Sequence, residues 1–371
     1  MGKMAGSSFG TIFRITTWGE SHGEGLGAVV DGCPAGIPLT EGYVQRFLDR
    51  RKPGKSKYAT KRTEPDRVQI LSGVFEGKTT GTPVSMMVKN EGQRSGDYSE
   101  IASCYRPGHA DYTFDAKYGF RDYRGGGRSS GRETVGRVAG GAVAEAMLSE
   151  IGIGFLTYVK SIGPVICSQE RFDREEISRN ALCMPDAEAA EEAQSYLDAC
   201  MEEKNSAGGV IECVITGVPA GIGDPVFEKL DANLAKAVFS IGAVKGFEIG
   251  SGFDAAKSDG RTNNDAFCLD EEGKIAKETN NSGGILGGIS DGSPIVFRAA
   301  VKPTPSIASP QRTVRTDGTP VTVEIRGRHD PVIAPRAAVV VEAMAALTIA
   351  DAVLLNMSAR QENIRDFYKN L

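Results

Sequence analysis

The alternation of apolar and polar positions divides the chain into helices and short strands. Apolar side chains follow Thr40 at helical spacing, which predicts a helix that Thr40 caps and that ends before Pro53. Residues 187–204 are rich in Ala and Glu and also predict a helix. Residues 337–355 are almost entirely apolar, as expected of a helix buried in the core or in a subunit interface.

Several shorter apolar runs are typical of β-strands. Four of them cover residues 68–74, 83–89, 209–216 and 294–301. Val321, Val323 and Ile325 alternate with polar residues, which indicates a half-buried strand. We therefore expect a chain that mixes helices with β-sheet.

Three short patterns occur twice, in the same order. Residues 32–37 (GCPAGI) and 217–222 (GVPAGI) agree at five of six positions, and each pair precedes a predicted helix. Residues 81–84 similarly correspond to 292–295. In the third pattern, a Gly-Arg pair, a later Arg and then Glu-Ala-Met occur at 127–128, 137 and 145–147 and again at 327–328, 336 and 342–344. The shared order predicts related halves, at about 6–150 and 205–356, around a pseudo-twofold axis. Because no linker separates them, we predict a single domain over residues 1–371.

Composition excludes several classes of protein. The 371 residues are 40% hydrophobic and 25% charged, as in soluble globular proteins. A net charge of −5 argues against a nucleic-acid binder, and no stretch of about 20 apolar residues lacks charge, so no membrane span is expected. Seven scattered cysteines without a Cys-x-x-Cys pair argue against a disulfide framework and a Cys-based zinc site. These features indicate a reduced, cytoplasmic protein.

Positive charge is concentrated in two segments. Between Arg46 and Arg67, nine Lys or Arg residues stand against three acidic residues. Further along, five arginines alternate with glycine and serine: Arg121, Arg124, Arg128, Arg132 and Arg137. Residues 125–134 (GGGRSSGRET) open a predicted helix, so guanidinium groups and backbone N–H groups can converge there on an anion. The segment matches neither the Walker A motif nor the dinucleotide fingerprint, which disfavours a nucleoside triphosphatase.

All three histidines lie in segments that are typical of loops. His22 belongs to residues 19–23 (GESHG), His109 to residues 106–111 (RPGHAD) and His329 to residues 327–331 (GRHDP). Loops on a rigid scaffold concentrate catalytic groups, and histidine transfers protons near neutral pH. Beside His329, Arg328 and Asp330 are equally good candidates for the catalytic group of that segment. The spacing of these histidines does not suit a metal site, so none is predicted.

Residues 19–23 and 127–131 (GRSSG) both match the G-x-S-x-G pattern, so a serine hydrolase is an alternative. The context argues against it, because residue 21 comes too early for several strands to precede it. Residues 125–127 follow a charged segment instead of an apolar strand. The residues themselves therefore favour an enzyme that acts on a phosphorylated small molecule through histidine-mediated proton transfer.

Taken together, these motifs resemble the chorismate synthase family. The resemblance rests on residues 19–23, 125–134 and 327–331, and also on residues 49–51, 106–111, 283–288 and 302–306. It is colinear from about residue 6 to about residue 355. It implies an α+β fold in which helices are layered between two antiparallel sheets, with pseudo-twofold duplication and long active-site loops. It also implies assembly as a homotetramer.

The resemblance implies a carbon–oxygen lyase that removes phosphate from 5-enolpyruvylshikimate 3-phosphate by 1,4-elimination. The product is chorismate, formed in the final step of the shikimate pathway of aromatic amino acid biosynthesis. Reduced FMN is the implied cofactor, because neither of the bonds that break is strongly activated and a flavin can lend electron density. An external flavin reductase is the expected reductant, with NADPH as the other possibility. A flavin-binding protein of different or no catalytic activity is the second alternative, but it would not need His22, His109 and Asp330.

The resemblance also assigns roles to individual residues. It makes His22 the proton donor to the leaving phosphate, puts His109 near the flavin and gives the flavin N5 proton to Asp330. FMN is expected to contact Arg128, Ser129, Ser130, Gly242, Ala243, Gly287, Lys302, Pro303, Thr304, Pro305, Ser306 and Arg328, with Gly242 standing where many relatives have Asn. Arg51 and Lys57 match positions assigned to NADP. The substrate is expected to contact Ser21, Arg51, Arg106, Arg132 and Arg328. The substrate carries one phosphate and two carboxylates, and FMN carries another phosphate. Arginine side chains would offset the repulsion among these four anionic groups in one cavity.

Overall fold

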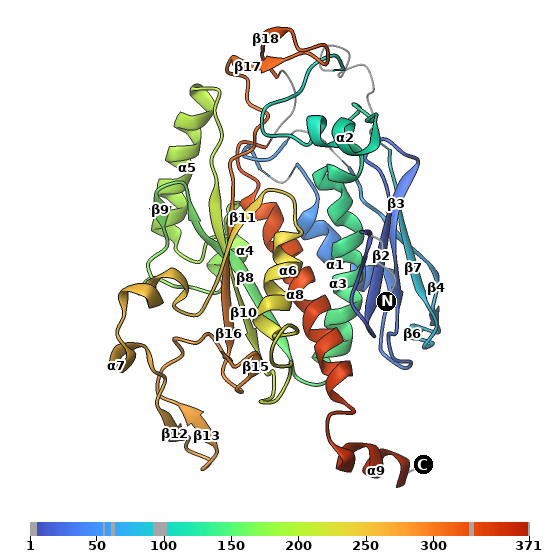
Figure 1. Ribbon diagram of the computed structural model, residues 1–371, viewed down its shortest axis with the longest axis vertical. Helices are drawn as coiled ribbons and strands as arrows, with labels where there is room; N and C mark the ends of the chain where they lie inside the picture. The colour runs from blue at the N-terminus through green and yellow to red at the C-terminus, as the bar shows by residue number, and fades with distance from the viewer. Residues whose placement is uncertain (1–5, 55, 61–63, 92–101, 326–329, 370–371) are drawn as a thin grey trace.

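Two five-stranded antiparallel sheets enclose a layer of helices in the computed structural model, which describes residues 6–54, 56–60, 64–91, 102–325 and 330–369 (Figure 1). The first sheet has the order β1 (Ser8–Phe9), β2 (Arg14–Gly19), β3 (Gly25–Asp31), β7 (Val84–Lys89), β4 (Val68–Ser72). The second has the order β11 (Val244–Ile249), β16 (Ile295–Val301), β10 (Gly209–Thr216), β8 (Gly154–Ile162), β9 (Val165–Ile166). Between them lie α1 (Glu41–Arg51), α3 (Thr134–Ser149), α6 (Leu230–Phe239) and α8 (Ala334–Asn356). This arrangement confirms the predicted fold class.

Shorter elements surround this sandwich. The helices are α2 (Asp111–Tyr118), α4 (Glu176–Arg179), α5 (Ala187–Glu202), α7 (Gly260–Asn263) and α9 (Gln361–Lys369), with 3-10 turns over Gly127–Ser129, Gly131–Glu133 and Gly252–Lys257. The strands form four hairpins: β5 (Val74–Phe75) with β6 (Lys78–Thr79), β12 (Phe267–Leu269) with β13 (Ile275–Lys277), β14 (Ile285–Leu286) with β15 (Ile289–Ser290), and β17 (Gln311–Val314) with β18 (Pro320–Val323). The β12–β13 hairpin and α9 project from the body (Figure 1).

The local sequence accounts for the main elements. The Oγ1 atom of Thr40 accepts the backbone N–H of Tyr43 at 3.1 Å, so Thr40 caps α1 as predicted. Helix α1 ends at Arg51, two residues before Pro53, and buries Val44 on its inner face. The predicted strands correspond to β4, β7, β10 and β16 within a few residues. Strand β18 ends at Val323, so Ile325 follows the strand instead of belonging to it.

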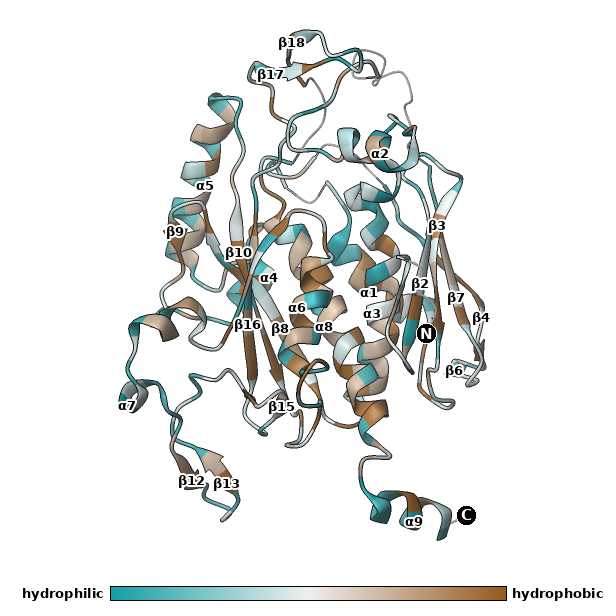
Figure 2. Ribbon diagram, viewed as in Figure 1, coloured by the Kyte–Doolittle hydropathy of each residue, from teal (hydrophilic) through white to brown (hydrophobic). Residues whose placement is uncertain are grey.

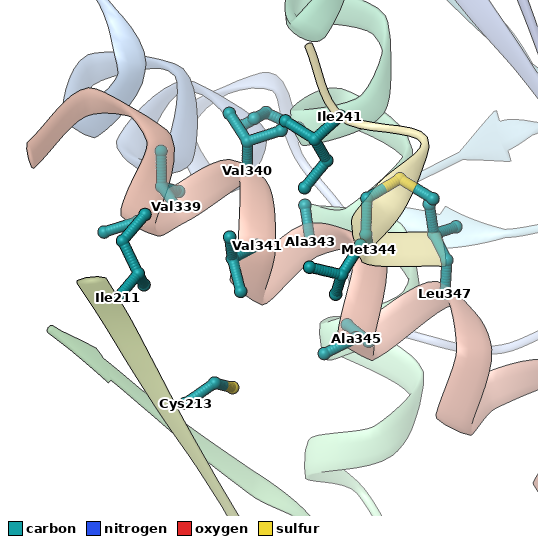
Figure 3. Packing of buried hydrophobic residues seen from close by; sticks show 14 of the residues in the cluster. Ile211, Cys213, Ile241, Val339, Val340, Val341, Ala343, Met344, Ala345 and Leu347 are labelled. Atoms are coloured by element: carbon teal, nitrogen blue, oxygen red, sulfur yellow. The ribbon is translucent and has the colours of Figure 1, made fainter. Parts of the chain in front are cut away.

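Helix α8 forms the centre of the core. It is long and apolar enough to cross a membrane, but 72% of its most apolar window is buried inside the fold, as in the core helix of a globular protein. The side chains of Val339 and Val341 lie on the side of α8 that faces Ile211 of β10 (Figure 3). Figure 2 shows the apolar residues gathered in the central helices and the strands that cover them. The expectation of a buried core helix is therefore confirmed.

Small residues let the central helices approach each other closely. A Cβ atom at Gly141 of α3 would lie 2.3 Å from the Cβ atom of Ala343 in α8, closer than carbon atoms can pack. A Cβ atom at Gly140 would likewise lie 2.3 Å from the Cδ1 atom of Ile15 in β2. Glycine lowers helix propensity, so its use at these positions is explained by the close contacts of α3.

The two sheets correspond strand by strand. Their order is the same when β2, β3, β7 and β4 are matched with β8, β10, β16 and β11. The Oγ1 atom of Thr79 in β6, the strand that precedes β7, accepts the N–H of Ile37 and donates to the carbonyl of Pro34. Ser290 in β15, the strand that precedes β16, makes the same pair of bonds with Ile222 and Pro219. These correspondences support the proposal of related halves.

Candidate active site

A cavity of about 610 Å³ lies where the C-terminal end of α1 meets the N-terminal ends of α3 and α8. Loops from both halves of the chain form its walls, and Figure 1 shows α2 beside this end of the helix layer. Its described lining brings together most of the predicted site residues: Ser21, Arg51, Arg106, His109, Arg128, Ser129, Ser130, Arg132, Gly242, Ala243, Lys302, Thr304, Pro305, Ser306 and Asp330. Segments that are up to about 300 residues apart in sequence thus share one cavity.

The lining is strongly cationic. Its described residues include seven cations and three acids: Arg51, Arg106, Arg128, Arg132, Arg137, Lys302 and Arg336 against Glu64, Glu133 and Asp330. Partly buried charges are screened less by salt and water than surface charges. The cavity is therefore suited to ligands that carry several negative charges.

The glycine-rich loop before α3 lies against His22. Gly125, Gly126 and Gly127 all have positive φ angles, of 69°, 83° and 53°. A Cβ atom at Gly125 would lie 2.4 Å from Cε1 of His22, so only glycine lets the backbone approach the imidazole ring. The Nδ1 atom of the same ring is 3.2 Å from the hydroxyl of Ser21, which lines the cavity.

His109 is fixed by two hydrogen bonds. Its Nδ1 atom lies 3.0 Å from the carbonyl oxygen of Pro107, which can only accept, so Nδ1 carries the proton of the neutral ring. The Nε2 atom then accepts from the hydroxyl of Ser306 at 2.9 Å. Burial of the ring, followed by the charge of Arg106, lowers the pKa of His109 below its usual value. The result is a neutral imidazole with a proton-accepting nitrogen.

Both carboxylate oxygens of Asp330 are held. Oδ1 accepts the backbone N–H of Thr60 at 2.6 Å, and Oδ2 accepts from Nη1 of Arg336 at 2.5 Å. The Nε atom of Arg336 donates to the backbone carbonyl of Arg51 at 3.1 Å. Sequence reasoning treated Arg336 only as part of the repeat and missed its place in the site. The available signal was its position as the only basic residue in the apolar helix α8.

Arg51 is almost fully enclosed. The residue is 3% exposed, and its three guanidinium nitrogens donate to Asp66, Thr134 and the carbonyl of Gly131 at 3.0–3.1 Å. Burial, followed by the charge of Arg336, lowers the pKa of Arg51 to about 10, so it stays charged at neutral pH. Arg51 therefore acts on a ligand mainly through its charge and by holding other groups.

The remaining arginines are also held by protein groups. The guanidinium of Arg106 donates to both carboxylate oxygens of Asp111, at 2.7 and 2.8 Å. Arg128 donates to the carbonyl of Gly19 at 3.0 Å and to the hydroxyl of Thr17 at 2.6 Å. Such contacts fix the orientation of each guanidinium group before any ligand binds.

Some predicted residues lie elsewhere. Lys57 is exposed and forms an ion pair with Asp198 at 2.8 Å, and it does not line the cavity. Gly287 follows β14 in the tight β14–β15 hairpin, and Figure 1 shows β15 at the end of the molecule opposite α2. Pro303 is exposed beside the lining residues. Arg328 and His329 lie outside the described residues.

One buried hydroxyl in the cavity tests whether a phosphorylated flavin fits. Oγ1 of Thr304 is inaccessible to solvent and has no hydrogen-bond partner among the described residues. A buried polar atom of this kind usually has a partner, so a ligand with polar groups suits this wall. The volume also lies within the range of about 300–1,000 Å³ that is typical of small-molecule sites. The residues present fit FMN.

Comparisons with known proteins agree on one family. The model of the chorismate synthase family matches residues 13–354. The chain is 68% identical to the chorismate synthase of Agathobacter rectalis, over 99% of this chain and 100% of that protein. It is 54% identical to that of Methanosarcina mazei, over 95% and 97% of the two chains. A crystal structure of chorismate synthase is similar with a TM-score of 0.75 and 33% identity, over 98% of both chains.

Proposed function

The chain belongs to the chorismate synthase family, and from this premise we propose that reduced FMN and the substrate bind together in the cavity around His109 and Lys302. The activity is that of a carbon–oxygen lyase, which eliminates phosphate from 5-enolpyruvylshikimate 3-phosphate to give chorismate in the shikimate pathway. A serine hydrolase and a flavin-binding protein without this activity are therefore set aside.

The observation that carries the proposal is the convergence of cations on one cavity. The substrate has one phosphate and two carboxylates, and FMN adds a second phosphate. Bringing these four anionic groups together without counter-charge would be strongly unfavourable. The seven lining cations supply that counter-charge, and their guanidinium and ammonium groups are already oriented by protein partners.

We assign FMN to the wall made by the 128–130, 242–243 and 302–306 segments. Lys302 donates to the carbonyl of Gly108 at 2.7 Å, which joins this wall to the loop that carries His109. Thr304 offers a hydroxyl that lacks a protein partner among the described residues. When bound, reduced FMN supplies electron density to the allylic system and takes up the departing hydrogen. For a single chain this assignment omits Gly287 and Lys57, which lie away from the cavity.

The proposed proton-transfer roles are supported by the contacts that each side chain makes. His109 is a neutral imidazole whose Nε2 atom accepts a hydrogen bond, so it is suited to hold or accept a proton near the flavin. We therefore assign proton donation to the leaving phosphate to His22, which lies beside Ser21 and Gly125. The Asp330 carboxylate, oriented by Arg336 and the Thr60 N–H, is assigned to accept the proton of flavin N5.

The phosphate of the substrate is assigned to Arg106 and Arg132, which line the same cavity, and Arg51 adds its charge. The same proposal includes Arg328, which lies outside the described residues. Loss of phosphate builds negative charge on the leaving group, which these cations stabilise as it forms.

We also propose that the protein is a cytoplasmic homotetramer. Large apolar side chains on the projecting β12–β13 hairpin support this assembly, since Phe267, Leu269 and Ile275 are 65–77% exposed. Exposed apolar groups on a projecting arm are typical of contacts between subunits. An external flavin reductase is the proposed source of reduced FMN.

A titration of FMN tests the assignment of the flavin wall. Lys302→Gln should weaken FMN binding about tenfold, because one charge-assisted contact is lost. Lys245→Gln removes the same charge from an exposed position on β11 and should leave FMN affinity unchanged. Equal affinity in the wild type and Lys302→Gln would contradict the assignment.

A comparison of reductants tests the source of electrons. Under anaerobic conditions with FMN, dithionite should support chorismate formation and NADPH alone should not. Turnover with NADPH and FMN as the only additions would instead identify an enzyme that reduces its own flavin.

A further inference from the structure

Arg132 contacts three protein acceptors at the cavity wall. Its Nε atom donates to Oδ1 of Asn90 at 2.5 Å, and its Nη1 atom donates to Oδ1 of Asp66 at 2.8 Å. Nη1 also donates to the carboxylate of Glu64. The side chain of Arg132 is only 8% exposed and lines the cavity. Its two acidic partners lie two residues apart in the chain but differ in their surroundings.

Asp66 is a fixed part of the fold. It is fully buried, does not line the cavity, and bridges Arg132 to Arg51 through its two carboxylate oxygens, at 2.8 and 3.0 Å. Its backbone carbonyl accepts from Gln45 at 3.1 Å, and its φ angle of 45° is unusual for a residue other than glycine. Removing its carboxylate would leave two buried guanidinium groups without their shared partner.

Glu64 differs from Asp66 in each of these respects. It lines the cavity, and its side chain is 13% exposed. Within the described part of the chain, Arg132 is the only hydrogen-bond or ion-pair partner of its carboxylate. Breaking the contact would remove no hydrogen bond from a second arginine, while the charge of Glu64 also acts on Arg51. The freed side chain lies at the cavity, where an entering ligand can reach it.

The other two acids of the lining are held by partners of their own. Glu133 accepts from Nε of Arg137 at 2.9 Å, and Asp330 is held by Arg336 and by the N–H of Thr60. Glu64 alone among these three acids is paired with a cation that the proposed function assigns to the substrate. A carboxylate is also the same chemical group as two of the four anionic groups that the proposed ligands carry.

We propose that Glu64 acts as an internal substitute for the substrate anion: its carboxylate occupies Arg132 in the ligand-free enzyme and is displaced when the phosphate or a carboxylate of the substrate binds. The inference rests on the proposed function, which assigns Arg132 to the substrate. Without Glu64, this mostly buried arginine would keep Asp66 and Asn90 but lose its cavity-side partner, which is unfavourable. Glu64 satisfies it when the cavity is empty, and this competition lowers the affinity for external anions.

Binding of inorganic phosphate to the full-length protein without flavin, measured by calorimetry, tests the exchange directly. Glu64→Gln and Glu64→Ala should each bind phosphate about tenfold more tightly than the wild type, since a charged competitor is gone. Glu271→Gln removes the same charge from the exposed β12–β13 turn and should leave phosphate affinity unchanged. The double variant with Glu64→Gln and Arg132→Gln should not show the increase in phosphate affinity.

Asp66→Asn provides the contrast between a fixed partner and a displaceable one. It should weaken phosphate binding and lower the melting temperature, because Asp66 orients Arg51 and Arg132 together. If folded Glu64→Gln and Glu64→Ala proteins bind phosphate no more tightly than the wild type, Glu64 only orients Arg132 and the proposal is wrong. If both bind more tightly but neither they nor the wild type form chorismate with reduced FMN, the anion exchange stands and the proposed function fails.

Discussion

The Nε2 atom of His109 lies 2.9 Å from the hydroxyl oxygen of Ser306, which joins two loops that are nearly 200 residues apart in the chain. The carbonyl of Pro107 fixes Nδ1 as the protonated nitrogen of the neutral ring, which leaves Nε2 to accept from the Ser306 hydroxyl in that form. A neutral His109 is also favoured by burial and by the charge of Arg106, which both lower its pKa.

His109 should therefore titrate below its ordinary pKa of about 6.5. The protein has only three histidines, so their ring signals can be followed and assigned by NMR with His→Gln variants. Arg106→Gln should shift the titration of His109 upward, since one unfavourable charge is removed. A group with a depressed pKa in the folded state stabilises the fold above its unfolded pKa, and this contribution is lost as the pH falls through the folded pKa. A His109 titration at or above 6.5 would refute the assignment.

Replacing either proposed proton-transfer histidine should separate chemistry from binding. His22→Ala and His109→Ala are expected to lose about 10²–10⁴-fold in kcat, the usual contribution of a positioned acid or base. Both should still bind FMN, because the cations of the flavin wall remain. Asp330→Asn should likewise lower the rate far more than FMN affinity. Stopped-flow turnover and an FMN titration on the same preparations provide the two readouts, and full rate in any one variant would remove that residue from the mechanism.

The carboxyl group of Glu145, which is close to the buried Glu342, should make stability depend on pH. Burial, followed by the charge of Glu342, raises the pKa of Glu145 well above its ordinary value, although Arg50 acts in the opposite direction. The folded state therefore binds this proton more tightly than the unfolded state, and stability falls as the pH rises from the unfolded pKa through the folded one.

Glu145→Gln, which resembles the protonated acid, should thus raise the melting temperature at pH 8. The gain should vanish as the pH approaches 4.5. Glu150→Gln removes the same charge at the exposed end of α3 and should show no such trend. Calorimetric melting curves between pH 4.5 and 8 would decide, and a pH-independent difference would exclude a buried acid that titrates on unfolding.

The contact between α3 and α8 should tolerate no added methyl group. Gly141→Ala places a Cβ atom against Ala343, and overpacking of this kind typically costs about 1–3 kcal/mol. Helix propensity alone would favour alanine by about 1 kcal/mol, so the sign of the change distinguishes the two effects. Gly42→Ala, in the exposed first turn of α1, has no comparable neighbour and should be neutral or stabilising. Urea unfolding of both variants measures the difference.

Residues that depend on local pattern could be predicted, whereas the ionic network of the site could not. The cap at Thr40, the end of α1 before Pro53 and the buried helix α8 follow from spacing and composition within one segment. The shared carboxylate of Asp66 depends on two arginines, 15 residues before it and 66 residues after it, and on which loops meet in three dimensions. No periodicity within one segment records that meeting.

The exposed position of Lys57 could not be predicted for the same reason, because it depends on the three-dimensional fold. Its basic neighbourhood in the sequence resembles that of Arg51, but α1 ends between them and turns only Arg51 inward. Arg336 shows the reverse case, since a single cation in an apolar helix reaches Asp330 because α8 begins at the cavity. Charge in sequence therefore indicated a site, while the fold decided which charges belong to it.

Anaerobic conversion of 5-enolpyruvylshikimate 3-phosphate, followed by the absorbance of chorismate, tests the joint binding of flavin and substrate most directly. The wild-type protein should form chorismate only when reduced FMN is supplied, with phosphate released in equal amount and the flavin still reduced at the end. Chorismate formed at the same rate by protein freed of flavin would contradict the account.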